Sequence, residues 1–230
     1  MSAIYHARQK FSDFEVFSEA ARNWNVDFRQ LDRGRLDAEH MFLGTAETQI
    51  MRVRLGRKFH QFGAAPTSGR TIALIDPGSS LPEWCGRRIT HDTMPIFAAD
   101  GSFESVSHPK FQVFTVSVSD DCMNAIAEIH DLQLGLERFG ESGMVVNCHR
   151  SVLDRLRNRI SQAFRLAGDA KTQPVADLIQ PILEREVPNL ILRAAIDGLE
   201  TNQKSVRPRR RGRALSGRSG STGCTAALGC

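Results

Sequence analysis

Seven histidines stand in the chain, but none of them forms a His-x-His pair. Metal-dependent β-barrel enzymes bind a catalytic ion through several histidines and a carboxylate, and two of the histidines are typically close together on one strand. The sequence also contains no Gly-x-Ser-x-Gly nucleophile turn, no phosphate-binding P-loop and no His-Glu-x-x-His zinc motif. We therefore expect no catalytic residues, no bound metal and no cofactor.

Four other positions are candidates for contacting a small molecule. His40 and His60 lie in the runs AEHMFL and KFHQF, where each side chain points either into a barrel or out to solvent. Met51 alternates with arginines in TQIMRVRL, so that strand has one buried and one wet face. Trp84 lies in the turn-rich stretch LPEWCG, where it either closes the mouth of a barrel or packs on the core. A binding role for these four residues requires a barrel that holds a ligand.

The elements that must position these residues lie between Val26 and about Val118. Eight or nine short runs rich in β-branched and aromatic residues follow one another there, separated by turn signals such as DRG, APTSG and DPGSS. Asp100-Gly101 is a two-residue hairpin signal, because both central positions of such a turn need a positive φ. No helical pattern lies between the runs. The spacing predicts an antiparallel sandwich or barrel rather than a parallel α/β sheet.

Helical patterns flank this region, so the expected fold class is α+β. On its N-terminal side, Ser12 and Glu15 in FSDFEVF have the spacing of a capping box. On its C-terminal side, Ser119 is a candidate N-cap. Residues 149–168 then carry an apolar stripe of Leu153, Leu156, Ile160, Ala163 and Ala167.

Prolines at positions 174, 181 and 188 predict two or three short or kinked helices in the last part of the chain. One side of this part is apolar and contains Leu178, Ile182, Leu190, Ile191 and Ala194. Such a stripe is typical of an intramolecular core, although a partner helix would suit it too.

The composition is that of a globular protein of the cytoplasm. The hydrophobic fraction of 41% suffices for a core. No run of about 18 apolar residues is present to span a membrane, and the N-terminus lacks the apolar segment of a secretory signal. The five cysteines never form a C-x-x-C pair, so we expect reduced thiols rather than a disulfide or metal framework.

The basic character of the chain belongs to its last 27 residues, which contain no acidic residue. Removing the seven positive charges of residues 204–230 from the net +4 leaves residues 1–203 with −3. The candidates for contacting nucleic acid are Arg207, Arg209, Arg210, Arg211 and Arg213. Such a run neutralises phosphates without sequence preference or serves as a solvated linker, and no aromatic residue is interleaved for base stacking. DNA contact through this tail is expected to be weak or indirect.

The order of these elements resembles a known family over about residues 10–203. The likeness rests on the pattern RQL-x-x-G-x-L, the strand that ends in MRVRLG, and QFGAAPTSG before the next strand. Turn glycines at positions 34, 63 and 101 add to it. The region resembles the N-terminal effector-binding and dimerisation region of AraC-type bacterial transcriptional regulators. Within that group it is most similar to the branch that includes the ethanolamine-operon regulator.

The resemblance implies a cupin-like barrel that binds a small effector (residues 1–118, N-terminal helix included) and a helical dimerisation segment (119–203). Such regulators continue into a DNA-binding domain of about 100 residues with two helix-turn-helix units. Only 27 residues follow Gln203 in this sequence. We therefore expect a sensor region that lacks its DNA-binding domain, through truncation, a frameshift or as a natural sensor-only protein. The tail, 204–230, is expected to be disordered.

This interpretation predicts a non-enzymatic, cytoplasmic protein with three kinds of partner: a small-molecule effector, a second copy of the chain, or an intact regulator. The alternative is a cupin-like small-molecule-binding barrel or enzyme that is unrelated to transcription. A stoichiometric bound transition metal would favour that alternative. Salt-sensitive DNA binding that disappears when residues 204–230 are deleted would instead favour direct DNA binding through the tail.

Overall fold

The computed structural model describes residues 3–20, 24–66, 69–98, 101–132, 144–169 and 173–206. Asp100 of the expected hairpin turn and all five candidate tail arginines lie outside these ranges. The described residues form two antiparallel sheets and a set of helices, which confirms the α+β class and the antiparallel sandwich or barrel. None of the described helices is long and apolar enough to cross a membrane.

The larger sheet has seven strands. Their order is β1 (Tyr5–Phe11), β3 (Ala38–Gly44), β4 (Thr48–Leu55), β11 (Phe111–Val118), β6 (Arg70–Ile75), β9 (Thr93–Ile96) and β12 (Met144–Asn147). The smaller sheet has five strands, in the order β2 (Val26–Gln30), β5 (Phe59–Ala64), β10 (Ser102–Ser107), β7 (Glu83–Trp84) and β8 (Arg87–Arg88). The helices are α1 (Phe14–Ala20), α2 (Asp120–Ile129), α4 (Arg150–Asp169), α5 (Gln173–Pro181), the π-helical segment η2 (Ile182–Glu186) and α6 (Val187–Val206).

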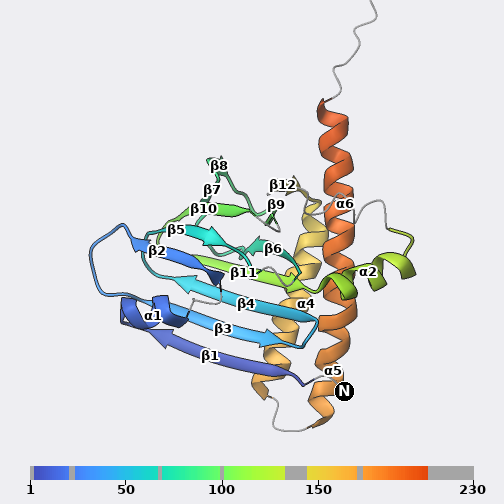
Figure 1. The fold of residues 1–230 in the computed structure, drawn as a ribbon, viewed down its shortest axis with the longest axis horizontal. Helices are drawn as coiled ribbons and strands as arrows, with labels where there is room; N and C mark the ends of the chain where they lie inside the picture. Colours follow the sequence, from blue (N-terminus) through green and yellow to red (C-terminus); the bar gives the residue numbers. More distant parts are fainter. Residues whose placement is uncertain are drawn as a thin grey trace, which may run out of the picture.

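The seven-stranded sheet is the middle layer of the molecule. On one side α2, α4 and α6 cover it, with α4 and α6 running across the strands (Figure 1). On the other side lie the five-stranded sheet and α1, which share a second apolar cluster with it. The seven-stranded sheet therefore divides the core into two apolar clusters, and each cluster buries one face of this sheet.

This position explains why the central strands are apolar along nearly their whole length. In β11, Phe114 and Val116 belong to the cluster on the helical side, whereas Phe111 and Val113 belong to the cluster on the other side. In β6, Leu74 likewise faces the helices and Ile75 the other sheet. Alternate residues of a strand point to opposite faces, so a strand buried on both faces needs apolar residues at both sets of positions.

The N-terminal helix forms where expected, but its cap is a different residue. Helix α1 begins at Phe14, and the Asp13 side chain accepts hydrogen bonds from the backbone N–H groups of Glu15 (2.9 Å) and Val16 (3.1 Å). The predicted capping box of Ser12 and Glu15 is therefore wrong by one position. An aspartate is as good a cap as a serine, so the local pattern did not distinguish between the two.

The C-terminal helices largely match the expectation. Ser119 caps α2 by accepting from the N–H of Cys122 at 3.1 Å, and the whole predicted stripe of α4 is buried. Pro181 and Pro188 lie on either side of η2, where the helix widens to a π turn. Leu178 is the exception, since 59% of it is exposed whereas Ile182 and Ile191 are buried. The expected domain divisions at 118/119 and 203/204 stay predictions.

Candidate functional site: a cavity between the sheets

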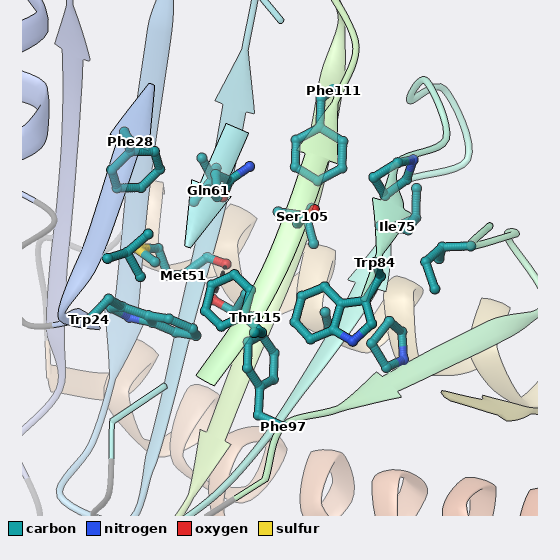
Figure 2. Close-up of a pocket in the computed structure, with 18 of the residues that line it drawn as sticks. Trp24, Phe28, Met51, Gln61, Ile75, Trp84, Phe97, Ser105, Phe111 and Thr115 are labelled. Atoms are coloured by element: carbon teal, nitrogen blue, oxygen red, sulfur yellow. Dashed lines mark hydrogen bonds between the residues drawn. The ribbon is translucent and has the colours of Figure 1, made fainter. Parts of the chain in front are cut away.

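A cavity that opens to solvent lies between the two sheets (Figure 2). The strands supply most of its walls, and Trp24, which lies between α1 and β2, adds to them.

The seven-stranded sheet contributes two cross-strand rows of side chains to the cavity. One row runs through His40, Val53, Val113 and Ile75 on β3, β4, β11 and β6. The next row, two residues along each strand, contains Met51, Thr115 and Ala73. These rows face the cavity because side chains two residues apart in a strand share a face.

The five-stranded sheet contributes a more polar row. Phe28, Gln61, Ser105 and Trp84 are paired in sequence across β2, β5, β10 and β7, and all four line the cavity. Figure 2 shows Gln61 between Phe28 and Ser105. A primary amide and a hydroxyl therefore lie side by side in a row whose other two members are aromatic.

A tight turn positions Trp84. Cys85 and Gly86 connect β7 to β8 with φ values of 46° and 70°, which is the geometry of a two-residue hairpin with both central positions in the left-handed region. The Trp84 ring then stacks on Phe103 (centroids 4.8 Å apart) and meets Phe97 edge-on (4.7 Å). Trp24 packs against the same Phe97 ring at 5.5 Å, so one aromatic cluster includes both tryptophans of the chain.

Two buried nitrogens on the cavity wall have no hydrogen-bond partner among the described residues. They are Nε2 of His40, whose residue is only 9% exposed, and the amide Nε2 of Gln61. Buried polar atoms are nearly always paired, since an unpaired one costs the free energy of removing it from water. Both residues line the cavity, and a ligand that reaches either nitrogen can supply the missing partner.

His40 is neutral in this setting. Its ring lies against Phe11 (centroids 5.0 Å apart) and Phe17 (4.9 Å), and burial lowers the pKa of the imidazole from 6.5 to about 4. Among the described residues that line the cavity, none is an Asp, Glu, Lys or Arg. The described wall thus has hydrogen-bonding atoms but no charge at neutral pH.

The structure brings together three of the four residues proposed from the sequence as ligand contacts. His40, Met51 and Trp84 line the cavity. His60 does not point into the interior, because it lies on the outer face of β5, where its Nε2 pairs with Glu104 Oε1 at 2.6 Å. Its neighbour Gln61 takes the inward position and was missed. Whether any of these residues binds a ligand stays a prediction.

Beneath the cavity, Arg157 of α4 connects the helical layer to the sheet. This arginine is 4% exposed, and its guanidinium donates to the backbone carbonyl of Ile75 at 3.0 Å, to the carbonyl of His91, and to Asp154 Oδ1 at 2.9 Å. Because Ile75 also lines the cavity, a single side chain links the cavity wall to α4.

No group of three or more His, Cys, Asp or Glu side chains in the described part of the chain is arranged to hold a metal ion. The expected absence of a metal or cofactor stays a prediction, as does the role of the tail arginines.

The comparisons with known proteins give a match at the level of structure alone. Neither the protein-family models nor the curated proteins include one that matches this sequence. Among solved structures, the AraC-like transcriptional activator CuxR is similar, with a TM-score of 0.58 and 12% sequence identity over 83% of this chain and 70% of that chain. At this identity the likeness shows a shared fold, which is the fold that the resemblance in the sequence implied.

Proposed function

We propose that this chain is the ligand-sensing and self-associating region of an AraC-type transcriptional regulator and that it carries out no catalytic step. A small molecule binds in the cavity between the sheets, and the helical layer passes the change on to a second subunit. The observation that carries the proposal is that the seven-stranded sheet forms one wall of the cavity with one face and packs against the helices with the other.

The physical basis of such a sensor is the thinness of this shared wall. Thr115 lines the cavity, whereas Phe114, the preceding residue of β11, packs in the helical cluster. A ligand that displaces Thr115 therefore acts on a strand that contacts the helices through its next side chain. Close-packed interiors transmit such displacements because they contain few voids that could absorb them. The fold shared with an AraC-like activator supports the same interpretation.

The pairing of two subunits belongs to this proposal. Leu178 of α5 is a large apolar residue that is 59% exposed, and it lies in the helical layer rather than on a sheet. Covering an exposed apolar side chain with a partner removes its surface from water, which favours association. The partner is a second copy of the chain or an intact regulator.

Sedimentation of the full chain over a wide concentration range tests the proposal. We expect a dimer that dissociates on dilution and that is weakened by Leu178→Asp. Phe62→Asp is the matched control, because Phe62 is 49% exposed on β5 and lies on the five-stranded sheet, away from the helical layer. A chain that stays monomeric at the highest concentration, or one that Phe62→Asp disrupts as strongly as Leu178→Asp, contradicts the proposal.

A further inference from the structure

We infer that the ligand of this cavity is an uncharged molecule with an aromatic ring and a hydroxyl or carbonyl oxygen that accepts a hydrogen bond from Gln61. The inference rests on the function proposed above, since it names the chemical class of ligand for the same cavity. Three features of the wall support it: its lack of charge, its aromatic side chains and its unpaired nitrogens.

The lack of charge disfavours ionic ligands. His40 is the one titratable side chain among the described residues that line the cavity, and burial keeps it neutral at the pH of a cell. A carboxylate or phosphate group would lose its hydration on entering and would find no opposite charge in return, and an ammonium group would have only the faces of aromatic rings to replace its water. A neutral ligand avoids that cost.

The aromatic side chains favour a ring. The indoles of Trp24 and Trp84 and the phenyl groups of Phe28, Phe97, Phe103 and Phe111 face the cavity (Figure 2). Aromatic rings prefer offset-stacked or edge-to-face neighbours, and a flat ligand offers a face and an edge to such walls. Four of these rings, Trp24, Trp84, Phe97 and Phe103, already contact one another, so they are fixed in orientation before a ligand enters.

The unpaired nitrogens specify the polar group of the ligand. The Gln61 amide nitrogen is a donor, so it needs an acceptor such as a hydroxyl or carbonyl oxygen. The His40 Nε2 is a donor or an acceptor according to its tautomer, and a hydroxyl suits either case. A site with buried hydrogen-bonding atoms rejects a ligand that leaves them unpaired, because their desolvation then goes uncompensated.

Three probes that share an ethylphenyl group separate these features: para-ethylphenol, ethylbenzene and para-ethylbenzoate. The first is neutral with a hydroxyl, the second has no polar group, and the third carries a negative charge at neutral pH. Calorimetry measures the affinities, and tryptophan fluorescence reports occupancy of the site, since Trp24 and Trp84 are the two tryptophans of the chain and both line the cavity. We expect the phenol to bind about tenfold more tightly than ethylbenzene and the benzoate to bind least.

A pair of variants on one strand assigns the preference to Gln61. Gln61→Leu should lower the affinity for the phenol by about tenfold and leave the affinity for ethylbenzene unchanged, so that the preference for a ligand with an oxygen disappears. His60→Gln changes the adjacent residue on the outer face of β5 and should leave all three affinities as they are. Equal weakening of the phenol and ethylbenzene by Gln61→Leu would mean a purely structural role for Gln61 and would overturn its assignment as the donor.

The probe comparison on the unaltered chain does not depend on how well the variants fold. Binding of the benzoate as tight as that of the phenol overturns the inferred ligand class but leaves the proposed sensor function standing. Equal affinities for ethylbenzene and the phenol overturn the inference that an oxygen of the ligand accepts a hydrogen bond from Gln61. If none of the probes binds and the tryptophan fluorescence stays unchanged, the cavity does not admit small molecules, and the inference and the proposed function fail together.

Discussion

The buried histidine on the cavity wall should make the protein sensitive to mild acid. The pKa of His40 is lowered to about 4 in the folded chain, and burial is the cause, whereas the ordinary value of 6.5 applies to the unfolded chain. Above both values the imidazole is neutral in both states and contributes no pH dependence. As the pH falls below 6.5, the unfolded chain takes up the proton first, so the folded state loses stability.

The size of this loss follows from the two pKa values. One pKa unit corresponds to about 1.4 kcal/mol, so the contribution at about pH 5 is a loss of about 2 kcal/mol relative to about pH 8. The loss approaches about 3 kcal/mol once the pH has fallen through the folded pKa. Small domains unfold with a total free energy of about 5–15 kcal/mol, so urea denaturation should detect this change readily.

The assay compares the free energy of unfolding of the unaltered chain with that of His40→Leu at several pH values. The variant should lose about 2 kcal/mol less between about pH 8 and about pH 5, because it no longer takes up the proton on unfolding. Met51→Leu changes packing on the same wall without removing a titrating group, and its pH dependence should match that of the unaltered chain. If His40→Leu and the unaltered chain lose stability in parallel, His40 is as easily protonated in the folded state as in the unfolded state, and the reasoning from burial is wrong.

Three further predictions concern stability and coupling. Arg157→Met should lower the free energy of unfolding in urea by about 3 kcal/mol, because it leaves the Ile75 and His91 carbonyls without their charged donor. The control Arg159→Met changes a side chain that is 41% exposed and should lower it by less than about 1 kcal/mol. Gln61→Leu should stabilise the ligand-free chain by about 1 kcal/mol in the same assay, since it removes an unpaired buried donor, and a loss of stability would mean that the amide is paired. Ser119→Ala should destabilise by about 1 kcal/mol, measured by thermal unfolding, because the first turn of α2 loses its cap, and an unchanged transition would contradict that role.

The strands could be predicted because each has its own local pattern, and the ones that were missed lack it. In β1, six of seven residues are exposed, so the strand shows no alternation of apolar and polar residues; its pairing with β3 is what defines it. β12 has only four residues and pairs with β9, a strand about 50 residues earlier in the sequence. A strand this short shows no period of its own, and only its pairing with β9 identifies it.

The inward face of a strand was harder to predict than the strand itself. In β5, Phe59 is fully buried but Phe62 is 49% exposed, and these two phenylalanines lie on opposite faces. A run with one aromatic residue on each face does not indicate which face is inside, so His60 and Gln61 were equally plausible from the pattern. Pairing of Gln61 with the buried Ser105 resolves the choice.

The position of Leu178 outside the core has a different physical reason. The π-helical segment η2 adds a residue to one helical turn. If the buried face of α6 is extrapolated backwards at 3.6 residues per turn, the positions assigned to α5 are therefore shifted by one residue. Ile179, rather than Leu178, faces the core with 1% exposure. The prolines at 181 and 188 indicated an interruption but not the direction in which the face would turn.

A cavity and a helical layer that share one sheet also limit what a ligand can do. A ligand changes the arrangement of the helices only by as much as its affinity differs between two arrangements, so tight binding alone has no effect. The residues that can produce such a difference are those that contact both sides, and Arg157 is one because it holds α4 to the backbone of Ile75 on the cavity wall. Coupling between two sites is reciprocal. The same Arg157→Met variant should therefore alter the affinity of the cavity for para-ethylphenol although its side chain lies outside the cavity, and an unchanged affinity would mean that the sheet separates the two layers instead of connecting them.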